Sequence, residues 1–343
     1  MSSDIKSEVN VIMFGPRRCG KTSILAAMTQ TFDKIKNTDL VLNTEYGDDV
    51  LDEALSSMKN IFRKNDQAFF TNNDLEATDV IREYYFNLST VESNAKKKSK
   101  HTKHTIRFSD IPGEFINPPR TSDISLQDRE ERRKIVGEKL AESDVIFIAI
   151  DTVMMMEEDG KYNEKCNCCG EISKFLKANL INADEKKMII FVPLKYETYY
   201  YSGMGAKVND MVKIYYDSLI NYLTKDTFKN TFYVAITPVL TLGDVIYGGS
   251  IDDDGGIIKA SFKFRCKNAT FNPEYCDQPL IHILKYIEHL IKYNKSGKIR
   301  NMWFEKFLNE KFNFKNDFYF MQEIEKLKYS GGNCYLIIQD IFS

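Results

Sequence analysis

The stretch VNVIMFGPRRCGKTSILAAM, residues Val9 to Met28, decides the fold. Residues 9–14 are apolar apart from one asparagine and predict a buried strand, whereas apolar residues recur at helical spacing from Lys21 onward. Between them, Gly15 to Thr22 have the GxxxxGK[ST] spacing of a phosphate-binding loop. Its glycines let backbone N–H groups surround an anion, and the helix N-terminus adds partial positive charge. The residues expected around the phosphates are Gly15, Pro16, Arg17, Arg18, Cys19, Gly20, Lys21, Thr22 and Ser23.

Lys21 and Thr22 carry the chemistry expected of this loop. Lys21 would neutralise the β- and γ-phosphates of a nucleotide, and the Thr22 hydroxyl would bind Mg²⁺. A carboxylate at the end of a neighbouring strand is expected beside the metal. Asp110 and Asp151 both follow apolar runs, but only Asp110 has a glycine three residues later, in D-x-x-G. We therefore expect Asp110 to bind the metal and Asp151 to cap a helix or form a turn.

Gly113, the glycine of that motif, would present its N–H group to a γ-phosphate. The loop around it would then distinguish a bound triphosphate from a diphosphate.

The run LKYE, at residues 194–197, ends a later apolar strand and is the candidate for reading the base. Lys195 would lay its stem over a purine, and the Glu197 carboxylate would accept from the N1–H and N2–H groups of guanine. Adenine offers no such pair of donors. An ordinary strand end of this composition is the alternative interpretation.

GPRRCGKT, DIPGE and VPLKYE, in this order, resemble the translation-factor-related (TRAFAC) clade of P-loop GTPases. They are most similar to bacterial members of the YcjX-like and double-GTPase type. In that clade the base motif reads N/T-K-x-D, so that Leu194 and Glu197 depart from it. The resemblance covers roughly residues 8–239 and the helix at 278–293. It implies a GTPase fold, GTP/GDP and Mg²⁺ as cofactors, and two nucleotide-dependent states.

The same resemblance implies two further contacts. Thr237 occupies the position of the last base-contact loop. A switch threonine before the second strand would also bind the metal, with Thr78 as the first candidate and Thr71 as the second.

The order of apolar and amphipathic runs predicts an α/β fold with a mostly parallel sheet. The resemblance makes this a three-layer P-loop NTPase fold, the Ras-like G domain, over residues 1–294, with an insertion at about 240–277 that contains a hairpin. Residues 295–343 are expected to form a mainly helical C-terminal extension. Residues 80–89 and 105–110 should pair as a hairpin, which gives the sheet one antiparallel strand. Further strands are predicted at 145–151, 187–194 and 231–239, and helices at 21–35, 48–63, 125–144, 172–181, 209–225 and 278–293.

Hydrolysis is expected to be slow. Arg17 stands where the family often has glycine, close to the γ-phosphate. Its side chain would either crowd a water-positioning residue and slow hydrolysis, or stabilise charge in cis, as an arginine finger does. Arg18 is a weaker candidate for the same role, and both side chains pointing to solvent is the alternative. Glu114 stands where many GTPases hold a residue that orients water, and its charge would repel the γ-phosphate. The candidate catalytic residues are Lys21, Glu114 and Arg17.

The composition sets limits on location and partners. The chain has 343 residues, a formal net charge of -2 and no apolar run long enough for a membrane span, so DNA and anionic membranes are not indicated. Seven cysteines and a polar first ten residues favour a reducing cytoplasm. Cys166, Cys168 and Cys169 cluster without a nearby histidine, which favours free thiols over zinc.

These observations predict a cytoplasmic GTPase that acts as a switch for a protein effector or a second nucleotide-binding subunit, with a dimer possible. An ATPase with the same loop is one alternative, favoured if Leu194 and Glu197 prevent guanine binding. A nucleotide-gated scaffold with negligible hydrolysis is the other, favoured by Arg17 and Glu114.

Overall fold

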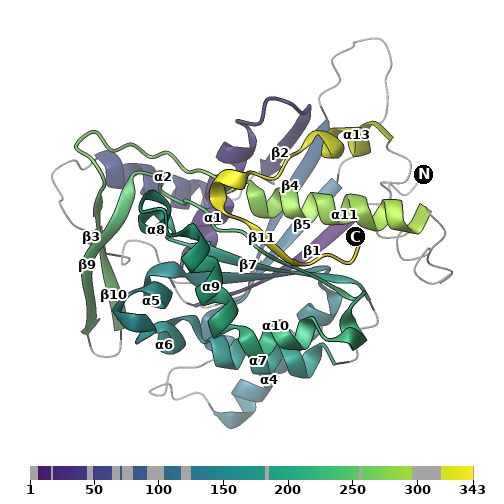
Figure 1. Cartoon of the computed structure of the whole chain (residues 1–343), viewed down its shortest axis with the longest axis horizontal. Coiled ribbons are helices and arrows are strands. Elements are labelled where there is room, and N and C mark those ends of the chain that lie inside the picture. Colours follow the sequence, from purple (N-terminus) through teal and green to yellow (C-terminus); the bar gives the residue numbers. More distant parts are fainter. Residues whose placement is uncertain are drawn as a thin grey trace.

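A mixed sheet of eight strands forms the centre of the molecule in a computed structural model (Figure 1). The structure describes residues 7–16, 18–44, 49–63, 70–71, 80–90, 104–116, 125–181, 185–254, 257–295 and 318–342. The strand order is β11-β8-β7-β6-β1-β5-β4-β2. Its strands are β1 (Ser7–Phe14), β2 (Leu40–Thr44), β4 (Arg82–Thr90), β5 (His104–Asp110), β6 (Val145–Asp151), β7 (Lys187–Leu194), β8 (Phe232–Ile236) and β11 (Leu336–Gln339).

The directions of these strands confirm an α/β fold with a mostly parallel sheet. Five adjacent strands, β8, β7, β6, β1 and β5, run parallel. β4 is antiparallel to β5, as expected from the hairpin. β11, at one edge of the sheet, is antiparallel to β8. Two strands, β4 and β11, therefore oppose the five parallel ones, and the expectation of a single antiparallel strand was wrong.

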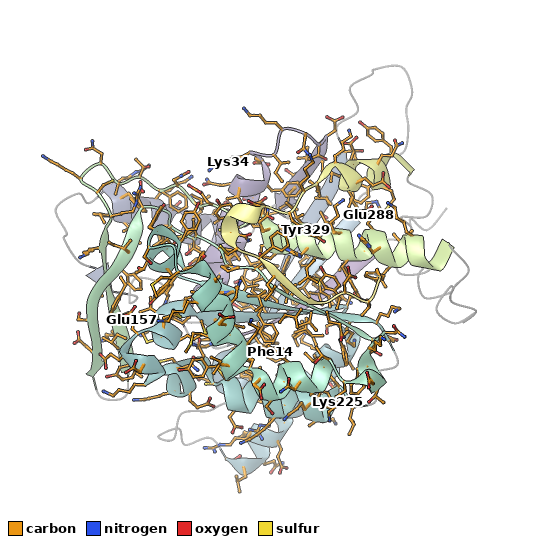
Figure 2. The ribbon with its side chains drawn as sticks, viewed as in Figure 1. Phe14, Lys34, Glu157, Lys225, Glu288 and Tyr329 are labelled. Carbon is orange, nitrogen blue, oxygen red and sulfur yellow. The ribbon has the colours of Figure 1, made fainter. Side chains whose placement is uncertain are left out.

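Helices cover both faces of the sheet, so its central strands are buried on both sides. Val9, Val11 and Met13 of β1 belong to one apolar cluster with α1, α11 and α13, whereas Ile12 and Phe14 belong to a second with α4, α7, α9 and α10. Phe14 (Figure 2) packs with its ring centroid 6.0 Å from that of Phe175. These helices are α1 (Lys21–Phe32), α4 (Leu126–Glu142), α7 (Cys169–Asn179), α9 (Gly205–Tyr215), α10 (Asp217–Leu223), α11 (Gln278–Lys295) and α13 (Phe318–Lys326).

A smaller antiparallel sheet, in the order β3-β10-β9, lies beside the main one (Figure 1). β9 (Val245–Asp254) and β10 (Ile257–Phe264) form the hairpin predicted in the insertion. β3 (Phe70–Thr71), which the sequence did not predict, pairs with β10. The ring of Phe62 on α2 (Asp49–Arg63) lies 5.3 Å from that of Phe264 and attaches α2 to this sheet.

One further expectation needs correction. Residues 209–225 form two helices, α9 and α10, because the buried Tyr216 leaves helical geometry with φ -104° and ψ 16° and packs against Phe191. Residues 295–343 were expected to extend the fold as a mainly helical segment. In their described part, α13 packs on α11 and β11 joins the main sheet.

The chain order fixes where a ligand site can lie. From β1 the chain crosses to the β2-β4-β5 side of the sheet, and after β5 it passes to β6 on the other side. Ligands of open α/β sheets bind outside the carboxyl ends of the strands, at such a change of direction. The loops after β1, β5, β6, β7 and β8 all leave this one edge.

No helix in the described residues is both long and apolar enough to span a membrane.

Candidate functional site

The loop between β1 and α1 adopts a conformation that requires glycine at both ends. Gly15 has φ +153°, and a Cβ there would lie 2.8 Å from the backbone oxygen of Ala149. Gly20 has φ +107° and forms the N-cap of α1. Arg18 between them is left-handed as well, with φ 61°. Arg17 lies outside the described residues.

Lys21 reaches back across this loop. Its Nζ donates to the backbone oxygens of Gly15 and Pro16, at 3.1 Å each, and lies 3.6 Å from Oδ1 of Asp110. Burial lowers the pKa of Lys21, but the Asp110 carboxylate, Cys19 and Tyr84 together raise it above its usual value. Lys21 is therefore a buried cation directed at the loop and at the end of β5.

Asp110 lies where the sequence predicted a metal ligand. β5 runs parallel to β1 in a register that pairs Met13 with Asp110, and the N–H of Ile111 donates to the Met13 oxygen at 3.1 Å. Asp110 is 1% exposed, and its Oδ1 receives no hydrogen bond from the described residues. Burial raises the pKa of Asp110, and Lys21 acts in the opposite direction.

Two residues that the sequence did not single out lie near this carboxylate. Arg82 is the register partner of Asp110 on β4, and its charge lowers the pKa of Asp110. Burial raises the pKa of the Tyr84 hydroxyl, and the Asp110 carboxylate adds to this shift while Thr22 opposes it, so Tyr84 lies close to both residues. The alternation of side chains along β4 indicated that Arg82 and Tyr84 lie on the same face of the strand. Only the register with β5 shows that this position is beside Asp110.

Gly113 begins the short helix α3 (Gly113–Ile116), three residues after Asp110. Glu114 follows it and is half-buried. Two arginines of α4 hold this helix: the guanidinium of Arg132 lies 4.9 Å from the ring centroid of Phe115, and Nη2 of Arg133 donates to the Ile116 oxygen at 3.2 Å.

On the other side of β1, Lys195 follows β7 in a left-handed conformation, with φ 55°. Its Nζ forms an ion pair with Oδ2 of Asp151 and lies 5.8 Å from the ring centroid of Phe262 on β10. Oδ1 of Asp151 accepts from the N–H of Met154 and caps α5 (Thr152–Met156), as predicted from the sequence. The pairing of Asp151 with Lys195 was not predicted.

Glu197 begins α8 (Glu197–Tyr201) and binds the insertion. Its Oε1 accepts from the N–H groups of Leu242 at 2.9 Å and Gly243 at 3.4 Å. Burial raises the pKa of Glu197, and these backbone donors act against it. In this geometry Glu197 anchors the loop that leads into β9, so its role in reading a base stays a prediction.

The threonines have different outcomes. Thr237, which follows β8, is buried, and its Oγ1 accepts from Nδ2 of Asn333 at 2.9 Å. Thr71 pairs through its backbone with Ser261 in the small sheet. Thr78 lies outside the described residues.

Cys19 lies between the two charged pairs of the site, Lys21 with Asp110 and Lys195 with Asp151. Burial raises the pKa of its thiol, and the charges of Lys21 and Lys195 both oppose that shift, while Asp151 and Asp110 add to it. The sulfur therefore lies among the charged groups of both pairs. The buried Ser23 completes the first turn of α1 behind it.

The remaining cysteines give no sign of a metal centre. In the described part of the chain, no three His, Cys, Asp or Glu side chains are arranged to hold a metal ion. Burial raises the pKa of both Cys166 and Cys169 to about 12.

No model of a known protein family matches this chain, and no curated protein matches it either.

Proposed function

We propose that this protein binds GTP with Mg²⁺, hydrolyses it slowly, and uses the difference between its triphosphate and diphosphate states to control a protein partner. The observation that carries this proposal is the position of Lys21. This lysine of a GxxxxGKT loop lies 3.6 Å from the buried Asp110, at the carboxyl edge of the sheet where the chain changes direction.

The loop is suited to phosphate groups. The first N–H groups of α1 have no acceptor within the helix, and helix N-termini favour anions. Gly20 at the N-cap has no side chain that would compete for those groups. The Lys21 ammonium adds a full positive charge that already lies against the backbone of the same loop.

The neighbouring carboxylate is suited to a divalent cation. Asp110 is buried, with the Lys21 ammonium 3.6 Å away, and burial of a carboxylate is costly unless its charge is compensated. Thr22 and Asp110 would hold Mg²⁺, which would neutralise phosphate charge when bound. Thr78, if it adds a third ligand, does so from outside the described residues.

The preference for guanine depends on residues after β7. Lys195 and Glu197 have the types and spacing that guanine recognition needs, but Oε1 of Glu197 is already bound to the insertion. This geometry favours an adenine nucleotide as the second candidate. The charge of Glu114, on the helix that follows Gly113, supports slow turnover, because a carboxylate there would repel the γ-phosphate.

The test is titration of the purified protein with GTP, GDP and ATP, with and without Mg²⁺, together with measurement of phosphate release. Lys21→Ala should lower nucleotide affinity about 100-fold or more, because it removes the buried cation of the loop. Asp110→Asn should abolish the effect of Mg²⁺ on affinity while leaving some binding. Lys213→Ala, at an exposed ion pair on α9, is the matched control and should bind as the wild type does.

Retained affinity in Lys21→Ala would overturn the phosphate site itself. ATP binding as tight as GTP binding would instead replace guanine by adenine and leave the phosphate site intact.

A further inference from the structure

Residues 330–335, here called the C-terminal turn, lie against the base side of the proposed site. They connect α13 to β11 and contain the short helix Gly331–Asn333. Tyr329, just before them, stacks on His282 of α11 with ring centroids 4.2 Å apart (Figure 2). The N–H of Ser330 donates to Oε1 of Gln278 at 2.7 Å.

Asn333 holds the loop after β8. Its side chain is fully buried, and Nδ2 donates to Oγ1 of Thr237 at 2.9 Å and to the oxygen of Pro238 at 3.1 Å. The last ladder pair between β8 and β11 joins Ile236 with Leu336. Asn333 thus attaches the C-terminal turn to Thr237, just beyond the last pair of β8 and β11. Thr237 is the residue expected to contact the base.

Cys334 reaches the segment that follows β7. Its backbone oxygen accepts from Nδ2 of Asn209 on α9 at 2.7 Å. A Cβ added to Gly205 would lie 2.3 Å from Oη of Tyr196 and 2.6 Å from Sγ of Cys334, so the three groups meet closely. Tyr196 directly follows Lys195 in the chain.

Gly332 contacts a third segment on the same side. A Cβ there would lie 2.5 Å from Oη of Tyr275, which is 3.0 Å from Oη of Tyr200 on α8. At Gly331, in contrast, no heavy atom lies within 4 Å of an added Cβ.

We propose that the C-terminal turn positions the base side of the nucleotide site, with Asn333 as a positioning residue that acts through Thr237. This inference rests on the proposed function. The turn contacts the loop after β8, the segment after β7 and Tyr275, and each of these contacts lies outside the phosphate loop. Its loss should therefore weaken recognition of the nucleoside and leave recognition of the phosphates unchanged.

The experiment compares Mg²⁺-GTP with inorganic tripolyphosphate by calorimetric titration of the full chain. In Asn333→Ala the affinity for GTP should fall about tenfold, since two buried hydrogen bonds are lost. Affinity for tripolyphosphate should stay within about twofold of the wild type, within the precision of such a comparison. Thr237→Val should lower GTP affinity too, and the double variant should bind no worse than Thr237→Val, because Asn333 acts through Thr237.

Gln339→Ala is the matched control. It removes a carboxamide from β11, outside the C-terminal turn, that donates to the Phe232 oxygen at the opposite end of β8. It should lower the melting temperature without changing the ratio of the two affinities. If Asn333→Ala does not fold, Gly332→Ala compared with Gly331→Ala tests the same turn through Tyr275, and only the first should lower GTP affinity.

Equal loss of GTP and tripolyphosphate binding in Asn333→Ala, or no loss of either, would overturn this inference while the proposed function stands. A wild-type protein that binds neither ligand would overturn the proposed function.

Discussion

Lys21 and Asp110 form a pair that the sequence could place, because each belongs to a motif with fixed spacing. Lys21 follows a glycine loop that only a strand and a helix can flank. Asp110 ends a strand that has to lie beside β1 if its carboxylate is to approach the loop. Arg82 and Asn333 carry no motif, and their positions depend on register and on contacts between distant segments, so single-sequence reasoning did not find them.

Gly15 is the residue of the loop where a side chain should be tolerated least. In Gly15→Ala, the added Cβ would collide with backbone and side-chain atoms of Ala149. The alanine would also have to adopt a φ of +153°. We expect the free energy of unfolding to fall by about 2 kcal/mol or more, with loss of nucleotide binding. Urea unfolding of Gly203→Ala is the control, because Gly203 has φ +72° but no atom near an added Cβ. Equal stability of the two variants would contradict the assigned close contact.

At the scale of the elements, long periodic segments were predicted well and short or interrupted ones were not. α2, α4 and α11 lie where the sequence predicted helices. β2 and β3 are short strands that need partners to exist, so local pattern gives them little signal. The break at Tyr216 comes from the packing of a buried ring on Phe191, which overrides helical periodicity.

The attachment of the β9–β10 hairpin gives the prediction at this scale. Glu197→Ala removes an acceptor shared by two backbone N–H groups, so amide hydrogen exchange at Leu242 and Gly243 should accelerate about tenfold or more. Glu197→Gln keeps an acceptor oxygen and should leave most of this protection. The exchange of Val234 in β8 serves as an internal reference. Unchanged exchange at both amides in Glu197→Ala would show that other contacts hold the loop.

The same two variants separate anchoring from base recognition. If Glu197 also reads guanine, Glu197→Gln should lose preference for GTP over ATP while the loop stays protected, because an amide cannot accept from both guanine donors.

In the whole molecule, one edge of the main sheet is formed by β11, a strand near the end of the sequence. The alternation of strands and helices predicted the parallel core, but nothing in LIIQ at residues 336–339 predicted pairing with β8. The aromatic cluster that attaches this segment includes the buried His282, between Tyr329 and Tyr335. Neither ring nitrogen of His282 has a hydrogen-bond partner in the described part of the chain.

This histidine makes stability depend on pH. Burial lowers the pKa of His282 to about 3, so the folded protein keeps it neutral while the unfolded chain, with a pKa of about 6.5, takes up a proton. Stability is therefore lost as pH falls below the unfolded value. Between pH 6 and pH 5 His282 should lower the free energy of unfolding by about 1 kcal/mol.

Urea unfolding at several pH values tests this, with His282→Phe expected to flatten the curve by that amount. His289→Gln, which changes an exposed histidine of the same helix, is the matched control. An identical slope in His282→Phe and wild type would mean that the buried ring is protonated in the folded state as well.

The pairing of β11 with β8 has a consequence for biosynthesis. Leu336 pairs with Ile236, which precedes it by 100 residues, so β8 leaves the ribosome long before its outer neighbour is made. Until then the nascent chain exposes a strand edge, the kind of surface that recruits chaperones or aggregates. The Asn333 contact to Thr237 forms at the same late stage. Under the proposed function, a chain interrupted before this point would contain the loop after β1 but lack the C-terminal turn, and nucleotide affinity would distinguish completed from prematurely terminated molecules.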